Sequence, residues 1–267
     1  MKAFVSQVYN KLRNSLNYRI EYLMSNEGIV RFGDHFLKHS LLSGQSFIVD
    51  LGANKGTFSK QVAEEIGCRI LIVEPNQDLL NKIEIDNSIK INALVASSPL
   101  LTDFYYSKNP EASSMDREIA SAFGITHSQQ IRGLPFSSLL EDNFIENVDL
   151  LKVDIEGAEI DLFLNTDIKY LDRCCQIAVE FHDFINPKYT DQIIDVIHKL
   201  SGIGFVVLKF SPLDHRCMLF IKTSMVNFSS LFILKFRFLQ SLSFALDYTY
   251  YKLLIRVKNL FNSVLEV

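Results

Sequence analysis

Residues 49–58 read Val-Asp-Leu-Gly-Ala-Asn-Lys-Gly-Thr-Phe and predict the end of an apolar strand, a tight turn and the start of a helix. Gly52 and Gly56 allow a positive φ angle or a close approach of the backbone to a ligand. The order Asp-x-Gly-x-Asn-x-Gly differs from the Gly-x-Gly-x-x-Gly fingerprint of nicotinamide and flavin enzymes. We therefore expect a ligand-binding turn at the end of a parallel strand, for a ligand that has no pyrophosphate.

From this turn onward, short apolar runs alternate with helical stretches, which predicts an α/β fold with helices on both faces of a parallel sheet. The predicted strands are 47–51, 69–73, 89–95, 149–153, 175–181, 204–209 and 216–222. The predicted helices are 57–66, 77–85, 156–165 and 188–201. Turn residues at 211–215 join the last two strands into an antiparallel hairpin. The sequence thus predicts a seven-stranded, mostly parallel, Rossmann-like sheet that ends in an antiparallel hairpin.

The second predicted strand ends in Glu74, at the same edge of the sheet as the glycine turn. Open α/β sheets bind ligands at this edge. The Glu74 carboxylate can accept hydrogen bonds from both hydroxyls of a ribose, and Asp50 can accept them from an ammonium group, directly or through water. The alternative for Glu74 is a surface residue that caps the next helix. Ribose and ammonium together fit S-adenosylmethionine, and its predicted binding residues are Asp50, Gly52, Ala53, Asn54, Gly56, Glu74, Pro75 and Asn76.

A second acidic string, at residues 149–159, reads Asp-Leu-Leu-Lys-Val-Asp-Ile-Glu-Gly-Ala-Glu. Its acidity is partly explained if Asp154 caps a helix and Glu156 and Glu159 favour the positive end of the helix dipole. That explanation does not cover Lys152, which lies inside an apolar strand and needs an ion pair to justify its burial. We therefore predict that Asp154 and Lys152 belong to a functional site.

The following strand ends in Glu180, and His182 comes two residues later. In this fold the strands that end at Asp50, Asp154 and Glu180 are neighbours, so these side chains are expected in one crevice. His182 has an ordinary pKa near neutrality and is our predicted general base, with Glu180 or Asp154 assisting it. The same cluster could hold Mg²⁺ or Mn²⁺, but no spacing demands it, and we predict no metal. No comparable context surrounds the other histidines: His35, His39, His127, His198 and His215.

The chain resembles the FkbM family of methyltransferases in four strings, at residues 49–56, 73–76, 150–159 and 180–182. Residues 134–142 are also similar to the family, with Ser138 where threonine is more familiar. The resemblance covers residues 45–222, about two thirds of the chain. It implies the class I methyltransferase fold and transfer of a methyl group to a hydroxyl oxygen, often on a sugar, a glycan or a polyketide-derived product. The identity of the acceptor does not carry over.

Three regions depart from this regular pattern. Thr102–Ser107 predicts an extra strand, and 108–133 a loop excursion that could recognise the acceptor.

Residues 1–45 predict a helical segment that packs on the domain at 46–223 or covers its substrate. Residues 224–267 predict an amphipathic helical tail with five basic residues and one acidic residue between 228 and 258. That tail could lie on an anionic membrane or pack on the domain or a second subunit.

The overall composition indicates a globular protein, with 48% hydrophobic residues and a formal net charge of −4. This charge argues against a nucleic-acid partner. The four cysteines lack zinc-ligand spacing, and charged residues interrupt any apolar signal core near the N-terminus, so we expect a cytoplasmic protein, with membrane contact left open. The alternatives to an enzyme are a catalytically silent cofactor-fold module and a membrane-peripheral assembly protein. A nicotinamide-dependent oxidoreductase is disfavoured by the glycine spacing.

Overall fold

The computed structural model describes residues 2–109, 113–211 and 214–265, with the backbone alone for residues 2–4, 254 and 256–265. The chain divides into two compact units. One unit is Ile29–Asn227, and the other combines Met1–Gly28 with Phe228–Val267.

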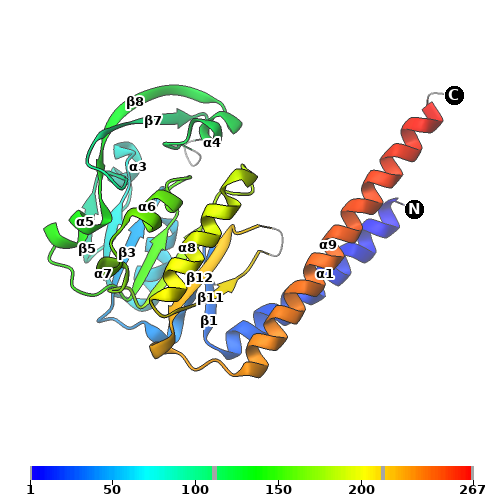
Figure 1. The fold of residues 1–267 in the computed structure, drawn as a ribbon, viewed down its shortest axis with the longest axis horizontal. Coiled ribbons are helices and arrows are strands. Elements are labelled where there is room, and N and C mark those ends of the chain that lie inside the picture. Colours follow the sequence, from blue (N-terminus) through cyan, green and yellow to red (C-terminus); the bar gives the residue numbers. More distant parts are fainter. Residues whose placement is uncertain (1, 110–112, 212–213, 266–267) are drawn as a thin grey trace. The chain divides into compact units, whose positions relative to one another are not determined.

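A seven-stranded sheet forms the centre of the larger unit (Figure 1). Its strand order is β11 (Phe205–Lys209), β12 (Cys217–Lys222), β10 (Gln176–Glu180), β9 (Leu150–Val153), β3 (Phe47–Leu51), β4 (Arg69–Val73) and β5 (Ser88–Ile91). The pairs from β10 to β5 are parallel, whereas β12 is antiparallel to β10 and to β11. The predicted α/β fold with a mostly parallel sheet is confirmed, and the strands that end near Asp50, Asp154 and Glu180 are neighbours.

Alternation along the strands separates two faces of the sheet. Leu71 and Val73 of β4 join the core cluster that also contains residues of α6 (Glu159–Asn165) and α8 (Thr190–Gly202). Helices α6 and α8 lie side by side (Figure 1). Ile70 and Ile72 point to the opposite face, and α2 (Thr57–Ile66) packs against β4. The remaining helices of this unit are α3 (Gln77–Asn81), α4 (Arg117–Ala122), α5 (Phe136–Asp142) and α7 (Ile168–Leu171).

Residues 29–38 form a β-hairpin where the sequence predicted helix. Strands β1 (Ile29–Phe32) and β2 (His35–Lys38) are antiparallel, and β2 contacts β10 and β12. The Gln176 side chain accepts a hydrogen bond from the Lys38 N–H at 2.8 Å and donates one to the Lys38 carbonyl at 3.3 Å. Four-residue strands are too short for a clear alternation pattern, so tertiary pairing decides this structure.

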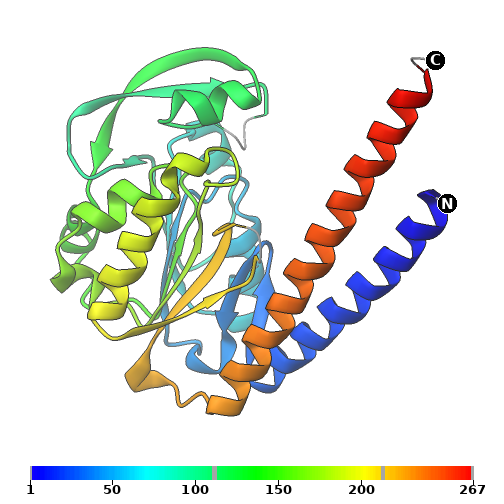
Figure 2. The ribbon, with the colours of Figure 1, turned by 45° about the vertical axis from the view of Figure 1, so that its right-hand side comes forward.

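The excursion after β5 is also more regular than predicted. The predicted strand 89–95 is split, because β6 (Leu94–Val95) leaves the main sheet and pairs with β8 (Ile125–Leu134). Strand β7 (Leu101–Ser107) confirms the predicted extra strand. The predicted loop at 108–133 is wrong over residues 125–133, because β8 pairs antiparallel with β7 in a ribbon visible in Figures 1 and 2; residues 110–112 of that loop lie outside the described residues. Residues 126–130 are exposed and mostly polar, so they carry no apolar alternation. Of the predicted turn at 211–215, residues 212 and 213 lie outside the described residues.

The smaller unit consists of two helices, α1 (Lys2–Asn26) and α9 (Ser230–Leu265). They run antiparallel and side by side in Figures 1 and 2. Helix α9 is one continuous helix of 36 residues and lies within the tail at 224–267 that the sequence predicted to be helical. Within the described part of the chain, no helix has the length and apolar character needed to span a membrane.

Candidate functional site

The glycine turn after β3 is required by the packing of the protein itself. Gly52 has a φ of +77°, and a Cβ there would lie 1.8 Å from the carbonyl oxygen of Asp154. Gly56 has a φ of +74°, and its Cβ would lie 2.9 Å from the Ile83 side chain. Both positions therefore exclude any side chain before a ligand is considered, and the positive φ angle that the sequence allowed at Gly52 and Gly56 is present at both.

Glu74 follows β4 and is 6% exposed. Its Oε2 accepts a hydrogen bond from the Asn54 N–H at 2.7 Å, and its Oε1 accepts one from the Asn76 N–H at 2.9 Å. Burial raises the pKa of Glu74. The helix-cap alternative for Glu74 is wrong, since the Asn76 side chain caps α3 by accepting from the N–H groups of Asp78 and Leu79.

Glu74 lines a cavity of about 550 Å³ of empty space, part of it open to solvent, which we call the Glu74 cavity. Its walls combine this carboxylate with apolar side chains from β4, α3, β6 and β7, which are Val73, Leu79, Leu94, Val95 and Phe104. Of the predicted cofactor-binding residues, those that line it are Gly52, Asn54, Glu74, Pro75 and Asn76. An apolar lining with a few polar groups is usual for small-molecule sites.

A second cavity of about 830 Å³ adjoins the first, and we call it the His35 cavity. The two cavities share four lining residues, Gly52, Asn54, Asp154 and Glu156. The β1–β2 hairpin contributes His35 and Asp34, and the main sheet contributes Lys152 and Glu180. Ala53 also lines this cavity. Two ligands bound in the two cavities would therefore meet at the turn after β3.

His35 was missed by the sequence analysis, which set it aside with the other histidines. It lies more than a hundred positions before Asp154, and only the hairpin brings it to the sheet. No spacing pattern in the sequence could have predicted that His35 and Asp154 lie in one site.

Asp50 and Lys152 form a buried pair beneath the turn. The two residues are in register on β3 and β9, so they share a face of the sheet. Lys152 Nζ lies 3.1 Å from Asp50 Oδ1 and donates a hydrogen bond to the Gly52 carbonyl at 2.7 Å. The Ser59 hydroxyl donates to Asp50 Oδ2 at 2.6 Å. Burial alone would lower the pKa of Lys152, but the carboxylates of Asp50 and Asp154 raise it.

Neither Asp50 nor Gly56 is among the described residues that line the two cavities. Asp50 is wholly buried, with one oxygen facing Lys152 and the other bonded to Ser59. This geometry argues against the predicted contact between Asp50 and a cofactor. Asp50 instead fixes Lys152, which in turn fixes the carbonyl of Gly52.

His182 is 5% exposed and is enclosed by carboxylates. Its Nε2 lies 3.1 Å from Glu156 Oε2, and its Nδ1 lies 3.2 Å from Glu159 Oε1. Burial alone would lower the pKa of His182, but the charges of Glu159 and Glu156 and their hydrogen bonds raise it well above the usual range. A protonated imidazole cannot accept another proton, and His182 is not among the described residues lining either cavity. The structure therefore argues against His182 as the base.

Glu180 is better placed than His182 to accept a proton. It lines the His35 cavity, and among the described residues it forms no hydrogen bond or ion pair. Its pKa is raised to about 8, first by burial and then by the negative charge of Asp154, with smaller contributions from Glu156 and Asp34, while His182 lowers it. A carboxyl group with a pKa near neutrality in a cavity has the properties of a general base.

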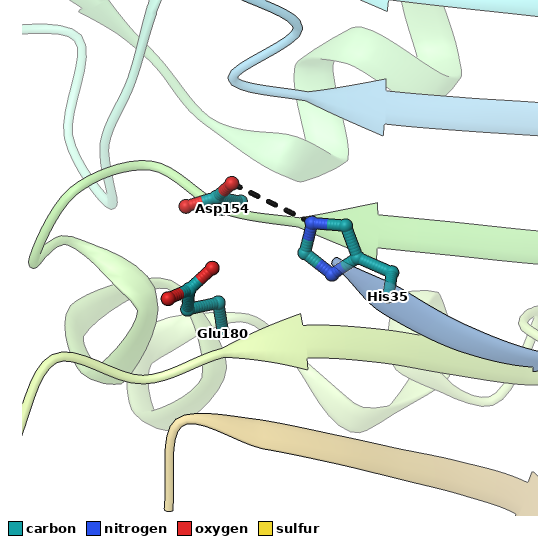
Figure 3. Close-up of side chains that lie close together, drawn as sticks. All are labelled: His35, Asp154 and Glu180. Atoms are coloured by element: carbon teal, nitrogen blue, oxygen red, sulfur yellow. Dashed lines mark ion pairs between the residues drawn. The ribbon is translucent and has the colours of Figure 1, made fainter. Parts of the chain in front are cut away.

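Figure 3 shows His35, Asp154 and Glu180 around one point at the ends of β2, β9 and β10. His35 Nε2 lies 3.5 Å from Asp154 Oδ2, and each of the three residues offers a ligand atom within 4.8 Å of the others. Two carboxylates and one imidazole suit Mg²⁺ or Mn²⁺ in principle. However, Lys152 Nζ, which also pairs with Asp50, places a positive charge 3.6 Å from Asp154 Oδ2, and this charge opposes the binding of a cation beside it.

Comparison with known proteins identifies one family. The family model of the FkbM methyltransferase domain matches residues 50–207. No curated protein matches the chain significantly.

Solved structures with similar folds include other methyltransferases. The FkbM methyltransferase of Methylobacillus flagellatus KT is 14% identical with a TM-score of 0.45, and the match covers 72% of this chain and 48% of that one. The chain thus spans about half the length of that protein. An rRNA methylase from Streptococcus thermophilus is 14% identical (TM-score 0.40, 68% and 87% covered). The fibrillarin of Aeropyrum pernix with natively bound S-adenosyl-L-methionine is 13% identical (TM-score 0.39, 74% and 72% covered).

Proposed function

Because the chain belongs to the FkbM family of methyltransferases, we propose that it transfers a methyl group from S-adenosylmethionine to a hydroxyl oxygen of a sugar, glycan or related metabolite. The observation that carries this proposal is the pair of adjoining cavities. One contains the Glu74 carboxylate, held by backbone N–H groups beside apolar walls, and the other contains the Glu180 carboxyl group, which has a raised pKa and no hydrogen-bond partner among the described residues.

The hydrogen-bonding groups of the Glu74 cavity fit this cofactor. Ribose hydroxyls and an ammonium group are donors, so their site must supply acceptors. Each Glu74 oxygen accepts one backbone hydrogen bond and keeps further accepting capacity. Asn54 Oδ1 and Asp154 Oδ1 are buried acceptors that have no hydrogen-bond partner among the described residues. When bound, S-adenosylmethionine supplies a methyl group on a positively charged sulfur.

We assign the residues of the glycine turn two kinds of role. Gly52, Ala53, Asn54, Glu74, Pro75 and Asn76 contact the cofactor or the space beside it. Gly56, Asp50 and Lys152 shape the turn from beneath, through the contacts with Ile83, Ser59 and the Gly52 carbonyl. A turn held from both sides keeps the cofactor in one orientation, which lowers the entropic part of the barrier to methyl transfer.

Glu180 takes up the proton that the acceptor hydroxyl loses as its oxygen is methylated. His35 and Asp154 face the same cavity and can position the acceptor by hydrogen bonds. His182 acts indirectly, because its positive charge holds Glu156, which lines both cavities.

We also propose that the acceptor is not a nucleic acid. The described lining of the His35 cavity contains four carboxylates, from Asp34, Asp154, Glu156 and Glu180, and two lysines. This balance disfavours a ligand rich in phosphate groups. The cytoplasm remains the proposed location, supported by four cysteines that are all free thiols.

The proposed function is tested in two steps. Calorimetric titration with S-adenosylmethionine should show binding, and absence of binding would reject the cofactor assignment. Incubation with radiolabelled cofactor and a fractionated cell extract should then label a glycan or small-molecule fraction. Binding without any labelled product would favour the silent-module alternative, and label in the nucleic-acid fraction would overturn the proposed acceptor class.

A further inference from the structure

The α1–α9 helix pair is held together by a narrow seam. Tyr9 and Tyr250 stack with their ring centroids 3.9 Å apart, and the Tyr9 hydroxyl donates to Asp247 Oδ1 at 2.9 Å. Arg13 Nη2 lies 3.3 Å from Asp247 Oδ2, and Arg13 also contacts the Ser243 hydroxyl. These polar and stacking contacts fix the register of the two helices, and they leave most large apolar side chains of α9 outside the seam.

Exposed apolar side chains cover much of this helix pair. On α9, Leu231, Leu234 and Phe238 are 58%, 66% and 65% exposed, and Leu242 is 45% exposed. They recur at intervals of three and four residues and therefore form one stripe along the helix. A groove between the two helices is lined by Phe238 and Leu242 of α9 and by Leu12 of α1, which is 50% exposed. Contiguous apolar surface of this kind marks an interaction site in a globular protein.

The charge of the helix pair identifies the kind of partner. Residues 1–28 and 228–267 carry nine basic and four acidic residues, a net charge of +5. The rest of the chain carries 18 basic and 27 acidic residues, a net charge of −9. The apolar stripe and the positive charge thus coincide in one unit.

The net positive charge disfavours a dimer formed through two copies of the helix pair. A symmetric contact would place the same surface, with a net charge of +5, against itself. An anionic membrane surface offers an apolar interior together with negative headgroups. The exposed tyrosines also suit such an interface, because their rings are apolar and their hydroxyls reach water. They are Tyr18, Tyr22, Tyr248 and Tyr251.

We propose that the α1–α9 helix pair binds the surface of an anionic lipid membrane. Leu234, Phe238 and Leu242 enter the boundary of the acyl chains, and the basic side chains lie at the headgroup level. The helices lie in the plane of the interface, as amphipathic basic helices do. The Ile29–Asn227 unit would then methylate an acceptor at or near that surface.

The test is sedimentation of the full chain with vesicles. We expect binding to vesicles that contain phosphatidylglycerol, loss of that binding at high salt, and little binding to phosphatidylcholine alone. The double variant Phe238→Asp/Leu242→Asp should weaken the partition coefficient at least tenfold. Lys235→Gln should weaken it about fivefold, because one basic residue near an anionic surface contributes on the order of 1 kcal/mol.

The matched control is Phe144→Asp, which removes a phenylalanine that is 93% exposed in the other unit and should leave vesicle binding unchanged. Retained S-adenosylmethionine affinity in every variant shows that the larger unit is folded, so this test can fail without affecting the proposed enzyme function. Equal binding to neutral and anionic vesicles, or none to either, would overturn the proposal. A concentration-dependent dimer that Phe238→Asp/Leu242→Asp dissociates, without vesicle binding, would assign the stripe to a second copy instead.

Discussion

The two cavities at the carboxyl edge of the sheet differ in how their carboxylates are held. Both oxygens of Glu74 accept backbone hydrogen bonds, so this side chain is fixed before any ligand arrives. Glu180 has no such partner among the described residues, and its pKa is raised to about 8 by burial and by Asp154. A fixed acceptor suits binding, and a carboxyl group that can gain and lose a proton suits chemistry. We therefore propose that the Glu74 cavity provides the affinity for the cofactor and that the His35 cavity provides the group needed for turnover.

The largest expected effect is that of Glu180→Gln on turnover. The amide keeps the size of the side chain but cannot accept the proton, so kcat should fall by about 10²- to 10⁴-fold with little change in cofactor affinity. Steady-state kinetics with a labelled cofactor measures this. If the variant keeps the wild-type kcat, Glu180 is not the base, and His35 or Asp154 becomes the candidate for that role.

Gly52→Ala should disrupt the boundary that the two cavities share. A Cβ would lie 1.8 Å from the Asp154 carbonyl, at a φ of +77°. We expect a loss of about 3 kcal/mol or more in the free energy of unfolding, from strain and steric overlap. Gly202→Ala is the control, because a Cβ there meets no neighbouring atom within 4 Å. Equal unfolding midpoints for the two variants would contradict the packing described for the turn.

Glu74→Gln should weaken binding of S-adenosylmethionine and leave kcat at saturation largely intact. The amide keeps one accepting oxygen but loses the charge and puts an NH₂ donor in place of the other acceptor, which should cost about 1.5–3 kcal/mol in total, or about 10- to 100-fold in Kd. Calorimetric titration gives the value. Asp78→Asn, on α3 outside the described lining of both cavities, serves as the control and should bind like the wild type.

The rate should depend on pH through Glu180. Its raised pKa means that the carboxyl group is protonated below about 8 and active as a base only above that value. The kcat should therefore rise about tenfold per pH unit toward pH 8 and then level off. In Glu180→Gln this slope should disappear. A midpoint near 6.5 that vanishes in His182→Gln instead would restore the histidine as the base.

Metal removal should have the smallest effect. The positive charge of Lys152, 3.6 Å from Asp154 Oδ2, opposes a cation there, so treatment with a chelator should leave kcat and cofactor affinity unchanged. Activity that is lost with chelator and restored by Mg²⁺ or Mn²⁺ would show that His35, Asp154 and Glu180 bind a cation.

The difference between the two cavities also explains what could be predicted from the sequence. In the Glu74 cavity, the glycine turn and Glu74 follow β3 and β4, which are consecutive strands, so hydrophobic runs and the glycine turn were enough to place Gly52, Asn54 and Glu74 together. The His35 cavity depends on a short hairpin whose strand β2 contacts β10 and β12. Its histidine could not be placed without the structure.

The protonation states of the site residues also could not be predicted from the sequence. His182 was predicted as the base from its ordinary pKa, but Glu156 and Glu159 pair with its two nitrogens. The side-chain partners depend on how the backbone turns after β9, where Glu156 has a φ of +53°. Local pattern carries no information about that turn.

The most direct test of this division is a pair of calorimetric titrations with S-adenosylmethionine, one on Glu74→Gln and one on Glu180→Gln. The two variants make the same chemical change in adjoining cavities. We predict that Glu74→Gln weakens the affinity about 10- to 100-fold, whereas Glu180→Gln binds like the wild-type protein. Equal affinities in the two variants, or weakening in Glu180→Gln alone, would contradict the assignment of the cofactor to the Glu74 cavity.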